Sequence, residues 1–366
     1  MGDRFPNRRR GATISDVAKL AGVTKGTVSK FLSPTPYYMS TATKERIEQA
    51  VRRLDFQPNV IAQGLANSRT MTIGVVVASV VNPFYPEMIA GVEEVIEPVG
   101  YTVLLGSTNN DPRREAKIVS SMAARQVDGI VMASVTLRDR EVGRLIESGL
   151  HVVLASRGLS TANVDTVKVD SHLGAAAALE HLMAHGHSRM AHIAGPQNVL
   201  PFKERRQGFE RALEAGGLTP VAIVETKSDQ NGGSEALSQL LELSRPPTAV
   251  FVGNDNMALG VMQTCDRRGV KIPDDLAIIG FDNIWVGGIT AKPLTTVDSM
   301  VRQIGRSAGQ LLLDKIRAND ATDSALRPPQ HLTLRPSLVL RSTCGCEEPP
   351  EEPLFFGINR KPVSGL

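Results

Sequence analysis

The spacing of apolar residues divides the chain into two regions of different texture. Over residues 13–54 the apolar positions recur three and four apart, which is typical of amphipathic helices. From Met71 onward, continuous apolar runs such as IGVVVASV and DGIVMASV alternate with segments of helical pattern. Such runs suit strands buried on both faces of a parallel sheet with crossover helices. The pattern therefore predicts a small helical domain followed by a larger α/β body.

Residues 13–32, TISDVAKLAGVTKGTVSKFL, predict two short helices joined by a turn at Gly22. Thr13 and Asp16 have the spacing of a capping box, and Thr24 is a good N-cap for the second helix. Two capped helices around a glycine turn indicate a helix-turn-helix, although an ordinary pair of packed helices is the alternative.

The second helix, expected over Lys25–Leu32, buries Val28 and Phe31. The opposite face is polar and basic, as a helix in a DNA major groove requires. The residues expected on that face are Lys25, Gly26, Thr27, Ser29 and Lys30.

Ser40 is expected to cap a third helix that runs to about Leu54 and completes a three-helix core. Beyond Pro58, the segment PNVIAQGLANSRT has a helical pattern but only about eight or nine usable residues. A helix this short is marginal alone in water, and Gly64 weakens it by about 1 kcal/mol. We expect it to fold only against a partner.

The apolar runs after Met71 form two series of similar size, which predict two α/β units. A helix from about Met300 to Arg317 follows, and HLTLRPSLVLRST then returns the chain to either unit. The last residues are rich in Pro and Glu and predict a disordered tail. The expected divisions are 12–57, 58–70 as a hinge helix and linker, 71–343 as the α/β body, and 344–366 as the tail.

The charge distribution supports a polyanionic partner at one end only. The first 70 residues carry a net charge of +7, whereas the remaining 296 carry −4. A basic headpiece on a mildly acidic body is the electrostatic pattern of a nucleic-acid-binding protein, although charge alone does not prove one. Because no secretory leader and no apolar membrane span is evident, we expect a cytoplasmic protein without membrane contact.

Metal and catalytic signals in the sequence are weak. Cys344 and Cys346 could bind a metal, but no second pair of ligands is obvious, so incidental tail cysteines are the favoured interpretation. His181, His185 and His187 cluster at a helix end without the Glu of H-E-x-x-H, which favours a cap or surface feature. The sequence also lacks a P-loop and a nucleophile motif, so we expect no cofactor, no metal and no catalysis.

The chain resembles the lactose-repressor (LacI/GalR) family of bacterial transcription regulators from about Ala12 to Thr343. The motifs that carry the resemblance are TISDVAKLAGVTKGTVSKFL, LDFQPNVIAQGLA, TIGVVV with NPFY, RQVDGIVMAS, RRQGFERAL, PPTAVFVGNDNMALGVM and IPDDLAIIGFDN. The resemblance implies a homodimeric regulator of a pseudo-palindromic DNA operator, with a periplasmic-binding-protein-like body of two subdomains that hold a small effector. A dimer is expected rather than a tetramer because the tail lacks a leucine heptad.

The resemblance also implies the DNA contacts. It places Lys25, Gly26 and Lys30 at base edges and the hydroxyls of Thr24, Thr27 and Ser29 at phosphates. The last base-contacting position is usually Arg, and Lys30 discriminates less because its ammonium cannot grip guanine in a bidentate way. In the hinge, the resemblance implies that Leu65 is a wedge inserted between base pairs in the minor groove, with Ala62 and Asn59 beside it.

The effector site is expected just after the carboxyl ends of the strands, where open α/β units bind ligands. The candidates are Ser79, Phe84, Tyr85, Arg157, Arg205, Asn254, Asp255, Asp282 and Trp285. Amides, carboxylates and guanidinium groups bind vicinal hydroxyls, and aromatic rings cover an apolar sugar face, so these residues predict a sugar or sugar-acid pocket. Purine-sensing relatives need an aromatic partner from the second unit, and SDQNGGS offers none.

Each candidate also has a structural interpretation, since the acids can cap helices, the arginines can form ion pairs and Trp285 can lie in the core. Two other functions stay open from the sequence. The chain could be a sugar-binding module without operator specificity, because Gly26 and Lys30 depart from the family pattern. Less plausibly, it could be a carbohydrate-processing α/β enzyme with an incidental basic headpiece.

Overall fold

The computed structural model describes residues 12–32, 37–57, 69–136, 141–159, 164–318 and 328–346, together with the backbone of Leu354–Phe355. The chain divides into two compact units, Met1–Thr70 and Met71–Leu366. The first is called the helical unit and the second the α/β unit. Each is described by itself.

The helical unit contains α1 (Ile14–Ala21), α2 (Lys25–Leu32) and α3 (Thr41–Arg53). The three helices meet around Val17, Val28 and Ile47, all of which are fully buried. Phe31, expected to be buried, is only half-buried at the edge of this core. The predicted positions of all three helices are confirmed.

The caps that delimit these helices are also confirmed. The Thr13 hydroxyl accepts from the amide of Asp16 at 3.3 Å while the Asp16 carboxylate accepts from the amide of Thr13 at 2.9 Å, which is a complete capping box. Gly22 ends α1 with a φ of +64°, a backbone conformation that other residues rarely adopt. Ser40 caps α3.

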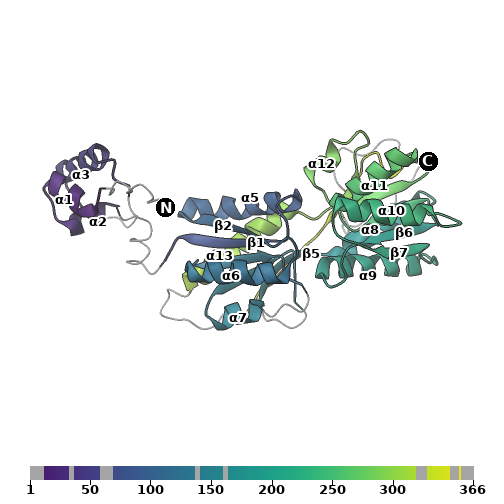
Figure 1. The fold of residues 1–366 in the computed structure, drawn as a ribbon, viewed down its shortest axis with the longest axis horizontal. Coiled ribbons are helices and arrows are strands. Elements are labelled where there is room, and N and C mark those ends of the chain that lie inside the picture. Colours follow the sequence, from purple (N-terminus) through teal and green to yellow (C-terminus); the bar gives the residue numbers. More distant parts are fainter. Residues whose placement is uncertain are drawn as a thin grey trace, which may run out of the picture. The chain divides into compact units, whose positions relative to one another are not determined.

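The first half of the α/β unit, called the first subdomain, is built on a parallel sheet. Among the described residues this sheet has the order β11-β5-β4-β3-β1-β2. Helices α5 and α13 cover one face and α6 and α7 the other, so the apolar runs pack on both sides (Figure 1). The elements are β1 (Thr72–Val77), α5 (Phe84–Ile96), β2 (Thr102–Ser107), α6 (Pro112–Ala124), β3 (Gly129–Ala133), α7 (Glu141–Glu147), β4 (His151–Ala155), β5 (Asp165–Val169), α13 (Val301–Ala318) and β11 (His331–Leu334), with a 3₁₀ turn η1 (Glu97–Val99) after α5.

The second subdomain repeats this design around a second sheet, of order β13-β12-β10-β9-β8-β6-β7 in the described part of the chain. Its strands are parallel from β7 to β10, and β12 and β13 join antiparallel. Helices α8 and α9 pack on one face, α10 and α11 on the other. The elements are α8 (Ser171–Ala184), β6 (Met190–Ala194), α9 (Leu200–Ala215), β7 (Ala222–Glu225), α10 (Gln230–Leu241), β8 (Ala249–Val252), α11 (Asp255–Arg268), β9 (Ala277–Asp282), α12 (Trp285–Gly288), β10 (Thr295–Asp298), β12 (Ser337–Val339) and β13 (Leu354–Phe355).

The described chain passes between the two subdomains three times. It crosses from β5 to α8, from β10 back to α13, and from β11 to β12, at 169–171, 298–301 and 334–337. The α5–α13 contact in the first subdomain is so close that a Cβ at Gly305 would lie 2.1 Å from the backbone oxygen of Met88. The predicted two-subdomain α/β fold with parallel sheets is therefore confirmed, with the return segment serving both sheets.

One expectation about the chain end needs correction. Disorder was expected over 344–366, but Cys344 is fully buried and Leu354–Phe355 pairs with β12. Leu and Phe suit a strand, but the Pro- and Glu-rich composition around them predicts disorder for the segment as a whole. The rest of that tail lies outside the described residues. None of the helices in the described ranges is long and apolar enough to span a membrane.

Candidate functional site

The α2 surface of the helical unit is polar, basic and accessible. Lys25, Gly26, Ser29 and Lys30 are exposed, while Val28 points into the core. Thr24 and Thr27 are tied to the helix start, because the amide of Thr27 donates to the Thr24 hydroxyl at 3.2 Å and the two hydroxyls lie 2.9 Å apart. α2 therefore presents the side chains expected to meet DNA on one continuous surface.

Lys30 has a neighbour that the sequence did not suggest. Its ammonium lies 4.2 Å from the centre of the Tyr37 ring, and Tyr37 and Tyr38 are 52% and 95% exposed. A cation over an aromatic face is attracted by the ring, by about 0.5–1 kcal/mol at an exposed site. Tyr37 thus restrains the otherwise flexible Lys30 side chain on the exposed face.

Gly26 leaves an open place on this surface. A Cβ at Gly26 would meet only the Thr24 hydroxyl, at an ordinary 3.7 Å. Packing within the described helical unit therefore does not require glycine here. The hinge residues Asn59, Ala62 and Leu65 lie outside the described residues, and their assignments stay predictions.

The α/β unit contains a cavity of about 650 Å³ between its two subdomains. Loops after strands of both sheets line it, as the strand-end rule predicts. Five of the expected residues lie in the wall: Ser79, Phe84 and Tyr85 after β1, Arg157 after β4, and Arg205 on α9. Asn254 and Asp282 line it as well, and Asn254 also caps α11 by accepting from the amide of Met257 at 2.8 Å.

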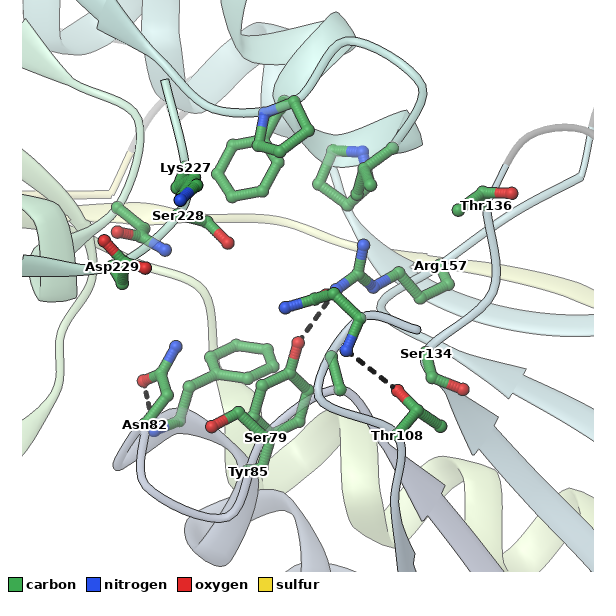
Figure 2. Close-up of a pocket in the computed structure, with 18 of the residues that line it drawn as sticks. Ser79, Asn82, Tyr85, Thr108, Ser134, Thr136, Arg157, Lys227, Ser228 and Asp229 are labelled. Atoms are coloured by element: carbon green, nitrogen blue, oxygen red, sulfur yellow. Dashed lines mark hydrogen bonds between the residues drawn. The ribbon is translucent and has the colours of Figure 1, made fainter. Parts of the chain in front are cut away.

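Arg157 belongs to the first subdomain and follows β4. Its Nη2 donates to the Tyr85 hydroxyl at 2.8 Å, and its Nε donates to the backbone oxygen of Ala133 at 3.2 Å (Figure 2). Its Nη1 is buried and has no hydrogen-bond partner among the described residues. The guanidinium is thus held in place with one donor unused.

Arg205 belongs to α9 in the second subdomain and is more tightly braced. It donates to the Asp282 carboxylate at 3.0 Å and to the backbone oxygen of Gly253 at 2.5 Å. Its guanidinium also lies 3.6 Å from the centre of the Phe281 ring. Only its Nε is buried without a partner in the described chain.

Burial changes the protonation of the acids near Arg205. Burial raises the pKa of Asp282 to about 6, and the Arg205 charge opposes that rise. The pKa of Asp255 rises further, to about 7, because the carboxyl is fully buried and close to Asp282. Both groups therefore titrate near neutral pH.

Two expected ligand contacts are not part of the cavity wall. Asp255 accepts from the Thr296 hydroxyl at 2.6 Å and from the amide of Ile284 at 3.0 Å, so its carboxylate is turned into the protein. Trp285 is 66% exposed and lies outside the wall, after Asp282 and Asn283, which both adopt positive φ angles. Neither side chain lines the cavity in this structure, so a ligand contact by Asp255 or Trp285 stays a prediction.

Several polar wall residues were not anticipated. The loop after β7 contributes Lys227, Ser228 and Asp229, and the loop after β2 contributes 108–111. Both loops follow strands, where open α/β units bind ligands. The loop after β7 is hard to find from the sequence because β7 is a short edge strand, AIVE, with a weak apolar pattern. Other such residues are Ser134, Thr136, Asn198 and Asn256.

Comparison with known families accounts for this combination of a helix-turn-helix and a two-subdomain body. The model "Periplasmic binding proteins and sugar binding domain of LacI family" matches residues 70–334, and "Bacterial regulatory proteins, lacI family" matches residues 13–59. The chain belongs to the LacI family. It is therefore a DNA-binding transcriptional regulator with a body of the small-molecule-binding type.

Individual LacI-family relatives match almost the whole chain. Catabolite control protein A of Priestia megaterium is 33% identical over 329 residues, which cover 89% of this chain and 98% of the relative. The HTH-type transcriptional repressor PurR of Aliivibrio salmonicida is 33% identical, with 84% and 92% covered. A lac repressor dimer bound to operator and the anti-inducer ONPF matches with a TM-score of 0.80 at 25% identity, covering 92% of this chain and 99% of that one.

Proposed function

We propose that this LacI-family chain is a repressor that binds a pseudo-palindromic operator as a homodimer and is controlled by a sugar or sugar acid in the cavity. It acts in the cytoplasm, where its DNA target is, and it does not turn its ligand over. The relatives named PurR and lac repressor support repression, and the lac repressor dimer supports the assembly.

The observation that carries the ligand class is the pair of unused guanidinium donors. Arg157 Nη1 and Arg205 Nε are both buried, both belong to wall residues, and neither has a partner in the described structure. A buried donor without an acceptor costs about 1–3 kcal/mol, and more when it is charged. A ligand with several oxygens, such as vicinal hydroxyls or a carboxylate, would supply those acceptors from both subdomains at once.

The rest of the wall agrees with a polyhydroxylated ligand. Phe84 and Phe202 offer apolar faces from opposite subdomains, and hydroxyls and amides surround them. Phe202, however, is an aromatic residue from the second subdomain, which the sequence argument against a purine did not foresee. Nucleobases therefore belong among the ligands tested.

The three crossing segments suggest how the ligand acts. A ligand held by both Arg157 and Arg205 favours one angle between the subdomains, and it shifts the equilibrium only by its unequal affinity for the two angles. We propose that this angle decides whether the two hinge segments of a dimer can pack together on DNA.

A thermal-shift panel tests the ligand class. Neutral sugars, sugar acids and nucleobases are added separately to the full-length protein, and the expected result is a rise in Tm for an oxygen-rich ligand. Replacing Arg157 with Gln should abolish the rise while leaving the ligand-free Tm nearly unchanged. If only a nucleobase raises Tm, the sugar proposal is wrong. Chemical conversion of the bound compound would instead favour the alternative of a carbohydrate-processing enzyme.

An operator titration at rising salt tests the DNA function. The expected result is a steep salt dependence and a preference for one operator over random duplex. Replacing Leu65 with Ala should remove much of that preference, because the proposed wedge kinks the duplex. Equal binding to all sequences, with normal effector affinity, would instead indicate a sugar-binding module without operator specificity.

A further inference from the structure

Two cysteines and two histidines converge in the second subdomain, outside the cavity wall. Cys346 Sγ lies 3.4 Å from His181 Nε2, 3.6 Å from His185 Nε2 and 3.2 Å from Cys344 Sγ. The ligand atoms of His181, Cys344 and Cys346 all lie within 4.8 Å of one another. Residues more than 150 positions apart thus bring two sulfurs and one ring nitrogen into one cluster. His185 Nε2 lies beside this cluster, close to Cys346 Sγ but outside the group whose atoms are all within 4.8 Å of one another.

Three separations from Cys346 can be compared with those around a tetrahedral zinc ion. With Zn–S of about 2.3 Å and Zn–N of about 2.0–2.1 Å, a tetrahedral site places sulfur and nitrogen about 3.5 Å apart and two sulfurs about 3.8 Å apart. The two sulfur–nitrogen distances of 3.4 and 3.6 Å agree with this geometry. The sulfurs need to separate by about half an ångström, and the exposed His185 side chain needs to turn toward the other ligand atoms. Cys2His2 is a common donor set for structural zinc.

The outer hydrogen bonds also favour metal binding. His185 Nδ1 lies 2.9 Å from the backbone oxygen of His181. A carbonyl oxygen only accepts, so Nδ1 carries the proton and the lone pair of Nε2 faces Cys346. Bound histidines in metal sites are usually fixed through the other ring nitrogen in this way.

The elements that carry the cluster explain its position. His181 lies in the last turn of α8 and His185 is the C-cap of that helix, four residues on and therefore on the same face. Cys344 and Cys346 follow β12 on the segment that leads toward β13, and Cys344 is fully buried in the core beneath α8. The cluster therefore joins the C-terminal segment to α8.

We propose that Cys344, Cys346, His181 and His185 form a structural site for a zinc-type divalent ion that fastens the C-terminal segment to α8. The cysteines bind as thiolates, so each releases its proton when the metal enters. The site is closed by four protein ligands and leaves no position for a substrate. It is independent of the proposed operator and effector functions, because none of its four residues lines the cavity.

Cobalt titration of the full-length protein tests this proposal. Metal is removed with a chelator under reducing conditions, and Co²⁺ is added stepwise. The expected result is one Co²⁺ per chain, with thiolate-to-cobalt charge-transfer absorption and the intense visible bands of a tetrahedral ion, both displaced by one equivalent of Zn²⁺. Zn²⁺ should also raise Tm, since it binds only the folded site.

Matched variants separate this cluster from other ligands. C344S/C346S should abolish the charge-transfer band and the Zn²⁺-dependent rise in Tm. H185A, at an exposed side chain, should keep the thiolate band, shift the visible bands as water replaces one nitrogen ligand, and weaken Co²⁺ binding. C265A removes the buried third cysteine, on α11, and H187N removes the nearest other histidine, and both should bind Co²⁺ as the unchanged chain does.

Three outcomes would overturn the proposal. One is the absence of stoichiometric Co²⁺ binding by the reduced protein. Another is unchanged binding by C344S/C346S, which would place the metal elsewhere. The third is a Cys344–Cys346 disulfide that persists in the reduced preparation, detected by thiol counting after unfolding, because that bond would leave no thiolates for a metal.

Discussion

The helical unit and the α/β unit build their functional surfaces in opposite ways. Every described candidate DNA contact comes from α2 and the residue that caps it, so a segment of nine residues determines the surface. The cavity wall is assembled from loops after strands of both sheets, separated by up to about 200 residues. Substitutions on the exposed face of α2 should therefore change DNA binding alone. Substitutions in the cavity should change the effector response, and those that break a buried ion pair should change folding as well.

The largest effect is expected from Arg205 in the cavity wall. Replacing Arg205 with Ala leaves the Asp282 carboxylate buried without its partner, which costs about 3–5 kcal/mol. The free energy of unfolding of the α/β unit, measured by denaturant titration, should fall by that amount. α1–α3 should keep their hydrogen-exchange protection.

A double variant separates the charge from the packing. Arg205→Met combined with Asp282→Leu removes both charges, and much of the lost stability should return. If the double variant is as unstable as the sum of the two single changes, the ion pair is not the origin of the effect.

Asp255 should make the stability of the α/β unit depend on pH. Its folded pKa of about 7 exceeds the unfolded value, so between about pH 4 and pH 7 the unfolded state releases a proton that the folded state retains. The free energy of unfolding therefore falls as the pH rises through this window, by at most about 4 kcal/mol. The Asp282 carboxyl contributes a change of the same sign.

Replacing Asp255 with Asn should remove its share of this loss, because the amide does not ionise and its oxygen can still accept a hydrogen bond where the carboxylate accepts from Thr296 and the Ile284 amide. Denaturant titrations at several pH values measure the difference between the variant and the unchanged chain. Asp266→Asn, at an exposed carboxylate on the same helix, is the control and should leave the pH profile unaltered. An Asp255→Asn profile parallel to that of the unchanged chain would contradict the assignment.

The α2 lysines should affect DNA and nothing else. If Lys30 contacts a base edge, Lys30→Ala should weaken operator binding by about 1–3 kcal/mol and relax the preference at one position. If it contacts only phosphate, binding should weaken on all sequences and the salt slope should fall by about one. Fluorescence anisotropy with operator and random duplex distinguishes the two, and Lys44→Ala, exposed on α3, serves as the charge-matched control.

The sequence predicted the local parts of the molecule better than the assembled ones. Caps and a glycine turn determine the helix-turn-helix within 20 residues, so its helices could be placed closely. Arg157 and Arg205 were found because strand ends converge at one edge of a sheet. Asp255 was expected at the ligand, but the first turn of α11 directs its carboxylate inward while its neighbour Asn254 lines the cavity, and no spacing rule separates the two. Cys346 and His181 lie close together only because the segment after β12 packs against α8, and no local sequence pattern predicts a contact between residues 165 positions apart.

The smallest effect is expected at the first helix cap. Replacing Thr13 with Ala removes the hydroxyl that accepts from the Asp16 amide, and loss of an N-cap of this kind costs about 0.5–2 kcal/mol. Hydrogen exchange at the α1 amides of the full chain should accelerate, while the Tm of the α/β unit and its response to effector stay constant. Thr13→Ser keeps the hydroxyl and should restore protection. A fall in α/β-unit Tm with Thr13→Ala would show that the two units fold as one cooperative body and that their functions cannot be separated.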